Sequence, residues 1–258
     1  MADYPLPHAS TDLTGRVALV TGATSGLGWR FSQVLAAAGA TVIPTGRREE
    51  RLAELEGVIA AAGGEAHPCR LDMTDTDSIM AAVDHAEAAA GTVDILINNA
   101  GIPDAQRAHK MSLDLIDRVF DTNLRGPYVL SCEVARRLIA AEMPGRMVNI
   151  SSIGAFRYEG QGAALYSMTK AGIARMSEVL AVEWARYHIN VNAIAPGAFS
   201  SEMMDGMLER MGDITTRMPR KRIGDPAQLD STLLYLCGPA SDAVTGTVIK
   251  VDDGQGAR

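Results

Sequence analysis

The sequence predicts an α/β fold in which a doubly wound parallel sheet of about seven strands carries helices on both faces, within a single domain. Short apolar runs of strand type alternate with longer helical patterns along the chain, which is typical of this fold class. The runs also end in polar or glycine-containing segments, at residues 22–28, 46–47, 72, 98–101, 151–152 and 196–197. Because the carboxyl ends of parallel strands meet at one edge, these segments are expected to surround one ligand site.

The order of the elements follows from the hydrophobic pattern. The apolar runs predict strands at residues 16–21, 41–45, 65–71, 93–98, 146–152, 189–195 and 248–251. Helical patterns lie at residues 29–38, 48–62, 75–90, 112–141, 166–170 and 225–237. We interpret residues 1–13 as an N-terminal arm and residues 14–258 as one domain. Within that domain, the methionine-rich segment 198–222 has no clear strand or helix pattern.

Composition limits the classes of function that the chain can have. A hydrophobic content of 47% and a charged content of 21% are ordinary for a soluble globular protein. The net charge of −7 argues against a general nucleic-acid partner. No apolar run reaches transmembrane length, and residues 1–10 lack the apolar core of a signal peptide. We therefore expect a cytoplasmic protein without a membrane partner.

The cysteines give no sign of a metal or a disulfide. Cys69, Cys132 and Cys237 are odd in number and far apart in the sequence. Their spacing matches neither metal ligands nor a disulfide framework, and the histidines form no ligand pattern. We expect reduced structural thiols and no structural metal.

Residues 21–28 form a glycine-rich turn between a predicted strand and a helical pattern. The glycines are Gly22, Gly26 and Gly28, in the spacing G-x-x-x-G-x-G. Glycines let the backbone approach a pyrophosphate, and the following helix N-terminus offers N–H groups and a positive dipole end. The context therefore predicts a dinucleotide site (a simple strand-to-helix turn is the alternative).

The end of the second strand bears on the choice between NAD and NADP. An acidic residue at this place binds the adenosine ribose hydroxyls, whereas an arginine suits a 2′-phosphate. The sequence has Gly46 followed by Arg47 and Arg48, and a guanidinium can offer a planar fork to a phosphate. We favour NADP(H), with NAD(H) possible. Alternatively, Arg48 and Arg51 form a solvated first turn of the next helix.

Two further polar residues each have two interpretations. Asp72, at the end of the third strand, can meet the adenine ring edge or cap the helix that starts near Asp75. Asn123 lies inside a long helical pattern, where asparagine is mildly unfavourable. It is a packing or bend residue, or it opens the helix to hold a water molecule.

The central motif of the chain is Tyr166-Ser-Met-Thr-Lys170. On a helix, positions four apart lie on one face, so the phenol and the ammonium are neighbours. A fixed positive charge favours the phenolate and lowers the pKa of the tyrosine. Tyr166 is therefore a candidate general acid/base, with Lys170 as the group that lowers its pKa.

From residue 14 to residue 254 the chain resembles the short-chain dehydrogenase/reductase family. The resemblance rests on these residues and motifs: Thr21-Gly22-x-x-x-Gly26-x-Gly28, Asn98-Asn99-Ala100-Gly101, Asn123, Ser152, Tyr166-x-x-x-Lys170 and Pro196-Gly197. It implies a Rossmann-type sheet, a nicotinamide cofactor, and interconversion of a ketone and a secondary alcohol by hydride transfer.

The resemblance also implies roles for individual residues. The catalytic residues would be Asn123, Ser152, Tyr166 and Lys170: Ser152 would bind the substrate oxygen, Lys170 the nicotinamide ribose, and Asn123 a proton-relaying water. The cofactor contacts would come from Gly22, Thr24, Ser25, Gly26, Leu27, Gly28, Arg47, Arg48, Asp72, Met73, Asn99, Ala100, Gly101, Tyr166, Lys170, Pro196 and Gly197.

One feature departs from the family pattern. The segment between Ser152 and Tyr166 is one residue longer than is usual, and we place the extra residue within residues 153–165. We assign Ser152 as the catalytic serine because it stands at the strand end, and Ser151 is the alternative.

In this family, the substrate is enclosed by the segment between serine and tyrosine and by the segment after Pro-Gly. Here they supply candidate substrate contacts from Ile153, Phe156, Tyr158, Gln161, Phe199, Met203, Met204 and Met207. Methionines adapt to irregular apolar shapes, so we expect segment 198–222 to be a lid over a medium-sized apolar carbonyl or a 3-oxoacyl substrate. The methionine spacing also fits an ordinary amphipathic helix.

Two other functions stay open, namely a polyol or sugar dehydrogenase and a non-catalytic redox sensor that binds NADP(H). Family members are commonly tetramers, so a homotetramer is expected, with a homodimer as the alternative.

Overall fold

The protein is described by a computed structural model that covers residues 8–158, 160 and 162–256. Its strands are β1 Val17–Thr21, β2 Thr41–Gly46, β3 Glu65–Ala66, β4 Cys69–Arg70, β5 Ile95–Asn98, β6 Gly145–Ile150, β7 Ile189–Pro196 and β8 Val248–Val251. All strand pairs are parallel, in the order β3-β2-β1-β5-β6-β7-β8, with β4 also paired to β2. The predicted doubly wound parallel sheet is confirmed.

Strand β1 shows why the centre of the sheet is apolar throughout. All five of its residues are buried, because β2 and β5 pair with its two edges and helices cover both faces. Its start is fixed by Asp94, whose carboxylate accepts the Val17 N–H at 2.9 Å and pairs with Arg16. Leu13, the last residue of the predicted arm, is fully buried and donates its N–H to the Ala38 carbonyl at 2.8 Å.

The prediction of one continuous strand at 65–71 was wrong. Two short strands, β3 and β4, pair with β2 instead, on either side of His67 and Pro68. Proline has no N–H to donate to the neighbouring strand, so the ladder is interrupted there. The two pieces occupy one edge position, and the sheet therefore has the expected seven positions.

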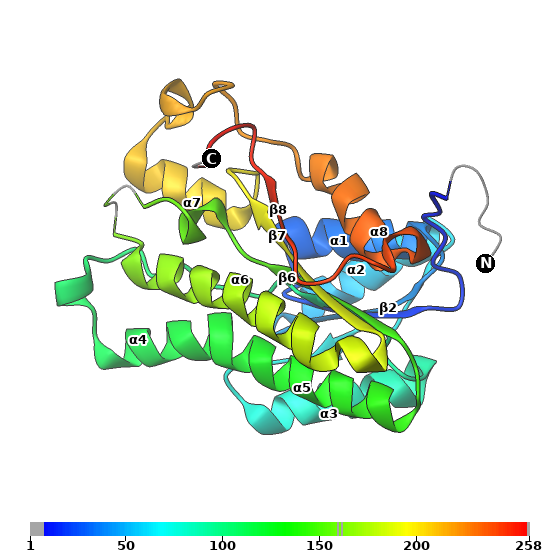
Figure 1. The fold of residues 1–258 in the computed structure, drawn as a ribbon. Coiled ribbons are helices and arrows are strands. Elements are labelled where there is room, and N and C mark those ends of the chain that lie inside the picture. The colour runs from blue at the N-terminus through cyan, green and yellow to red at the C-terminus, as the bar shows by residue number, and fades with distance from the viewer. Residues whose placement is uncertain (1–7, 159, 161, 257–258) are drawn as a thin grey trace.

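The helices form two layers, one on each face of the sheet (Figure 1). One layer consists of α1 Gly26–Ala37, α2 Glu49–Ala61 and α8 Asp230–Cys237, and the other of α3 Thr76–Ala90, α5 Gly126–Ala140 and α6 Ala164–Trp184. Each layer packs on its own apolar core, one centred on Phe31 and Leu55 and the other on Ile79 and Leu130. A short 3-10 helix, Pro226–Leu229, precedes α8, so the predicted helix 225–237 is α-helical only in its second half.

The predicted helix 112–141 is broken into three parts. Helix α4, Leu113–Phe120, passes into a π-helical turn at Asp121–Arg125, and α5 follows directly. In a regular α-helix the N–H of residue 127 would bond the carbonyl of Asn123, but Pro127 has no N–H. The wider turn accommodates this missing bond and places Asn123 inside the fold, fully buried.

The segment 198–222 contains helix α7, Glu202–Met211, and a 3-10 turn, Thr215–Arg217. None of the α7 residues is buried. In Figure 1, α7 and the segment after it lie outside the two helical layers. The segment is anchored at its base by a bridge between Phe199 and Gly224. The expected lid is therefore partly a helix, rather than irregular throughout.

Within the described residues, no helix is both long and apolar enough to cross a membrane. Cys69, Cys132 and Cys237 are free thiols. The part of the chain that the structure describes also contains no group of three metal-ligating side chains.

Candidate active site

A cleft of about 1000 Å³ lies at the carboxyl edge of the sheet, where the sequence predicted a site. The predicted residues that line it are Gly22, Thr24, Ser25, Gly26, Leu27, Arg47, Arg48, Asp72, Met73, Asn99, Ala100, Gly101, Ser152, Ile153, Tyr158, Tyr166, Lys170, Pro196, Gly197, Phe199, Met203, Met204 and Met207. Gly28, Asn123 and Phe156 do not line it. Gln161 lies outside the described residues.

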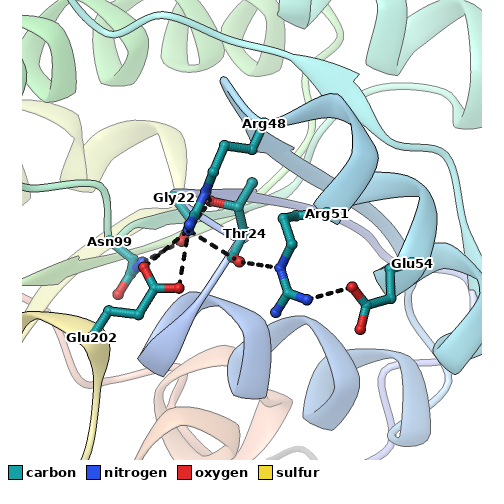
Figure 2. Close-up of polar contacts among 7 residues, drawn as sticks. All are labelled: Gly22, Thr24, Arg48, Arg51, Glu54, Asn99 and Glu202. Carbon is teal, nitrogen blue, oxygen red and sulfur yellow. Dashed lines mark hydrogen bonds and ion pairs between the residues drawn. The ribbon is translucent and has the colours of Figure 1, made fainter. Parts of the chain in front are cut away.

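The glycine turn is built on the strand end next to it. Thr21 Oγ1 accepts the N–H groups of Asn99 and Ala100, each at 3.0 Å. The Asn99 side chain donates to the Thr21 carbonyl at 2.9 Å. It also donates to the Gly22 carbonyl at 3.2 Å (Figure 2). Gly22 has φ +67°, and a Cβ there would lie 2.8 Å from Ala100 Cα, so only glycine fits. The ends of β1 and β5 are thus joined at the switch point of the sheet.

Helix α1 begins at Gly26, three residues earlier than the apolar pattern predicted. Gly26 and Gly28 therefore lie in its first turn, where N–H groups have no partner within the helix. These N–H groups and the helix dipole favour an anion at this end of the cleft. Gly28 instead serves close packing, because a Cβ there would lie 2.9 Å from the carbonyl carbon of Gly22.

Helix α6 presents Tyr166 and Lys170 at the base of the cleft. Lys170 Nζ donates to the Ile150 carbonyl at 2.7 Å and lies 5.7 Å from the centre of the Tyr166 ring. Ser152 hydrogen-bonds the Tyr166 phenol. The Ser151 hydroxyl donates to the Lys170 carbonyl at 2.8 Å, within the fold. The geometry thus favours Ser152 over Ser151 as the serine that faces a substrate.

The pKa values of Tyr166 and Lys170, at the bottom of the cleft, differ from what the sequence predicted. Burial raises the pKa of Tyr166; the hydrogen bond from Ser152 opposes this rise, and the charge of Asp104 adds to it. Burial lowers the pKa of Lys170 to about 8. The expected lowering of the Tyr166 pKa by Lys170 is not seen, because the ammonium is directed at the Ile150 carbonyl rather than at the phenol.

Asn123 lies behind the cleft and hydrogen-bonds the backbone of Ile102, which lines the cleft. Its Oδ1 accepts the Ile102 N–H at 2.8 Å, and its Nδ2 donates to the Ile102 carbonyl at 2.9 Å. A Cβ on Gly101 would lie 3.4 Å from Lys170 Nζ and 3.5 Å from Asn123 Oδ1. Asn123 therefore fixes the loop after β5 beside Lys170. It stands within the π-helical turn, and its two interpretations, a packing or bend residue and a residue that opens the helix to hold a water, stay predictions.

The two arginines after β2 have different surroundings. Arg48 donates from Nε and Nη2 to Thr24 Oγ1 at 3.1 and 2.9 Å, and pairs with Glu202 of α7 (Figure 2). Arg47 is exposed at the cleft and makes no hydrogen bond or ion pair to the residues described. The guanidinium of Arg47 is therefore available to an anionic ligand.

Asp72 faces the same part of the cleft. It does not cap α3, since Asp75 does so by accepting the Asp77 N–H at 2.9 Å. Burial raises the pKa of Asp72, but two hydrogen bonds from Thr74 and the charge of Arg47 outweigh it, so the net pKa is lowered. Asp72 is therefore an ionised acceptor beside Arg47.

Sequence comparison identifies the family to which these residues belong. The family described as short chain dehydrogenase matches residues 16–211. The chain belongs to the short-chain dehydrogenase family. A 3-oxoacyl-(acyl-carrier-protein) reductase of Aquifex aeolicus is 35% identical over 244 residues, covering 94% of this chain and 98% of that protein. A 2-dehydro-3-deoxy-D-gluconate 5-dehydrogenase of Dickeya dadantii is 35% identical over 250 residues, with 96% and 98% covered.

Solved structures agree with this membership. A gluconate 5-dehydrogenase from Burkholderia cenocepacia, solved in complex with NADP and tartrate, matches with a TM-score of 0.88 and 32% identity. The match covers 95% of this chain and 96% of that one. The Rossmann-type fold expected of a short-chain dehydrogenase is thus confirmed.

The sequence did not single out Asp104 in this short-chain dehydrogenase. Its buried carboxylate accepts the N–H groups of Leu165 and Tyr166 at 2.9 and 3.1 Å. An anion at a helix N-terminus is favourable, so Asp104 fixes the start of α6 and thereby the position of Tyr166 in the cleft. No local pattern connects residues so far apart in the chain, so this role could not be predicted from the sequence.

The substrate side of the cleft is both apolar and basic. The apolar lining includes Met203, Met204, Met207, Met211, Ile214 and Met218. The arginines at its mouth are Arg157, Arg210 and Arg217, and these three were not predicted from the sequence. Phe156 does not line the cleft, and the Lys250 ammonium lies 4.6 Å from its ring centre, so its substrate role stays a prediction. Phe199 lines the cleft but packs mainly into the core against Gly224.

Replacing Lys170 with methionine should stabilise the fold while it removes the ammonium. The folded-state pKa of Lys170 is about 8, below the 10.5 of an exposed lysine, so the fold carries a cost for the buried charge at pH 7. We expect the free energy of unfolding to rise by about 1–3 kcal/mol at pH 7. Urea denaturation, with loss of turnover checked in parallel, measures this.

The lowered pKa of Lys170 also determines how the free energy of unfolding should change with pH. Between about 8 and 10.5 the unfolded chain binds more protons than the folded one at Lys170, so wild-type stability gains with pH in this window. The advantage of the methionine variant should therefore shrink as pH rises from 8. Lys110→Met, at an exposed lysine, is the control and should shift stability by no more than about 0.5 kcal/mol. A Lys170→Met variant less stable than wild type at pH 7 would contradict the inference that the buried Lys170 ammonium destabilises the fold.

Proposed function

We propose that the chain is an NAD(P)-dependent oxidoreductase that interconverts a ketone and a secondary alcohol by hydride transfer. The observation that carries the proposal is the juxtaposition of Tyr166, Ser152 and Lys170 at the base of a cleft whose other end is the glycine turn. The residues fit the cofactor, because the turn at Gly22 has no room for a side chain and an unpaired helix end follows it.

Tyr166 is the proton carrier in this proposal. In reduction its phenol donates a proton to the carbonyl oxygen, and in oxidation its phenolate accepts the alcohol proton. Ser152 donates a hydrogen bond to the same oxygen and stabilises its developing charge. Lys170, mainly protonated at pH 7, binds ribose hydroxyls, and its ammonium lies 5.7 Å from the centre of the Tyr166 ring. The bound cofactor supplies or accepts the hydride at C4 of its nicotinamide.

NADP(H) is the favoured cofactor. Gly46 stands at the end of β2, where an acid would favour NAD, and the exposed Arg47 follows it. The gluconate 5-dehydrogenase of Burkholderia cenocepacia was solved with NADP, which supports the same choice.

Replacing Arg47 with alanine should weaken NADPH binding selectively. The guanidinium makes no hydrogen bond to the described residues, so its loss should affect the 2′-phosphate and not the fold. We expect the Kd of NADPH to rise about tenfold or more, with the Kd of NADH within about twofold. Titration of nicotinamide fluorescence measures both. An equal loss for the two cofactors would refute the role of Arg47.

The substrate proposed is a medium-sized carbonyl compound, in the first place of the 3-oxoacyl type. The methionines of α7 supply an adaptable apolar lining to the cleft, together with Ile153 and Tyr158. The reductase of Aquifex aeolicus is named for such a substrate. A basic mouth that includes Arg210 and Arg217 suits an anionic substituent remote from the ketone.

A sugar acid is the second candidate, and the same arginines favour it. Arg210 and Arg217 can bind a carboxylate, and the relative from Dickeya dadantii is named for a gluconate derivative.

A substrate panel tests the proposal. The wild type would be assayed with NADPH against acetoacetyl-CoA, a 5-keto sugar acid and a neutral ketone of similar size, and with NADP⁺ against the matching alcohols. Turnover of an anionic carbonyl with preference over the neutral ketone is expected. Binding of NADPH without turnover of any member would overturn the enzyme proposal and favour a redox sensor.

We further propose a cytoplasmic homotetramer, with a homodimer as the alternative. Tyr128 of α5 and Met168, Val179 and Val182 of α6 are exposed although apolar, which supports burial against other copies. Light scattering of the purified protein gives the mass directly, and a monomer at micromolar concentration would contradict the proposal.

A further inference from the structure

The carboxylate of Glu202 crosses from helix α7 to the cofactor side of the cleft. Its Oε1 and Oε2 accept from Arg48 Nη1 and Nη2 at 3.2 and 3.1 Å, a two-point pair (Figure 2). Ser25, in the glycine turn, adds a hydrogen bond to the same carboxylate. Glu202 is the first residue of α7, so the lid helix itself delivers this charge.

This carboxylate stands near the end of β2. Arg48 contacts Thr24, and a Cβ on Gly46, the last residue of β2, would lie 2.6 Å from Thr24 Cγ2. In a Rossmann-type sheet, the end of this strand provides the acid that accepts ribose hydroxyls or the arginine that accepts a 2′-phosphate. Here β2 ends in glycine, and an acid reaches the same neighbourhood from the lid.

We propose that Glu202 is a cofactor-specificity residue that restrains the preference for NADP(H) over NAD(H). This inference rests on the proposed nicotinamide-dependent function. Glu202 pairs with Arg48, so of the two arginines directly after β2 only Arg47, which lies beside Asp72, has no ion pair among the described residues. A 2′-phosphate would meet a negative charge and compete with it for Arg48, whereas a 2′-hydroxyl would not.

The charge balance supports this direction. Arg47 has no hydrogen bond or ion pair within the described part of the chain, while Arg48 is paired at two points. Arg51, the next cation along α2, is also engaged, by Glu54 and by the Trp29 ring at 4.7 Å. Like charges that approach each other repel, so removing the Glu202 charge should favour the more negative cofactor.

The ion pair could instead serve only to hold the lid. None of the α7 residues is buried, so a contact at its N-terminus contributes to its position. In that case, removing the charge would change binding of both cofactors by the same factor. Specificity and anchoring thus make different predictions for the ratio of the two affinities.

Glu202→Gln tests the inference, because glutamine keeps the size and can still accept a hydrogen bond from Arg48. The matched control is Glu209→Gln, which removes one exposed negative charge from the same helix without contact to Arg48. The Kd values of NADPH and NADH would be measured by nicotinamide fluorescence for the three proteins at low ionic strength.

The expected result for Glu202→Gln is an approximately five- to tenfold lower Kd for NADPH, with the Kd of NADH within about twofold. Glu209→Gln should leave both Kd values within about twofold, and the gain should shrink at high salt, as screening predicts. Competition by 2′,5′-ADP should strengthen in parallel, and competition by 5′-AMP should not.

An unchanged ratio of the two Kd values, or an equal shift of both, would overturn the specificity role. A wild type that binds neither nicotinamide cofactor would refute the proposed function itself, and the two failures are therefore distinguishable.

Discussion

Replacing Tyr166 with phenylalanine is expected to lower kcat by about 10²- to 10⁴-fold, the usual contribution of a general acid or base. Phenylalanine keeps the ring that packs beside Lys170, but it removes the hydroxyl that Ser152 contacts. Cofactor binding should stay within about threefold of wild type, because the glycine turn and Arg47 are untouched. Steady-state kinetics with the best substrate of the panel, together with a cofactor titration, measure both quantities.

Tyr235 provides a matched control for this experiment. It is an exposed tyrosine of helix α8 and does not line the cleft. Tyr235→Phe should therefore keep kcat within about threefold. Comparable losses in the two variants, or a Tyr166→Phe enzyme that retains more than about a tenth of wild-type kcat, would contradict the assignment of Tyr166 as the proton carrier.

A methyl group on Gly28 should disrupt both the fold and the cofactor turn. The new Cβ would lie 2.5 Å from Asn99 Nδ2 and 2.9 Å from the Gly22 carbonyl carbon. Because one of these neighbours is backbone, the turn itself must move. We expect Gly28→Ala to lower the free energy of unfolding by about 2–4 kcal/mol and to abolish measurable nicotinamide binding. Urea denaturation and cofactor titration give the two values.

Gly57→Ala separates this steric effect from the general effect of adding a side chain. Gly57 lies inside α2, and a Cβ there would have no neighbour within 4 Å. This variant should be about 0.5–1 kcal/mol more stable than wild type, because alanine favours helix. A Gly28→Ala protein as stable as wild type would show that the turn tolerates movement and that its geometry does not require glycine.

Local sequence patterns predicted the fold because strand and helix alternate with clear stop signals. Patterns failed where a tertiary contact or one missing N–H decides the structure. Pro68 divides the expected strand 65–71, and Pro127 widens the expected helix 112–141 at Asn123. Each proline was visible in the sequence, but its consequence depends on which neighbour needed the absent hydrogen bond.

The residues of the candidate site also fall into two groups, those that short sequence patterns predicted and those that such patterns missed. Motif residues such as Gly22, Ser152 and Lys170 were predictable, because their chemistry and spacing lie within short segments. Asp104 and Glu202 were not, because each acts on an element that is distant in the chain. The pKa of Tyr166 was also mispredicted, since burial, which no local pattern shows, raises it.

A titration of the wild-type protein with NADPH and with NADH, followed by nicotinamide fluorescence, tests directly whether the cleft binds a nicotinamide cofactor. Saturable binding of both cofactors is expected, with NADPH the tighter ligand. Absence of saturable binding for either would contradict the claim that the cleft is a nicotinamide site. Tighter binding of NADH would contradict the assignment of Arg47 to a 2′-phosphate and direct the substrate search towards alcohol oxidation.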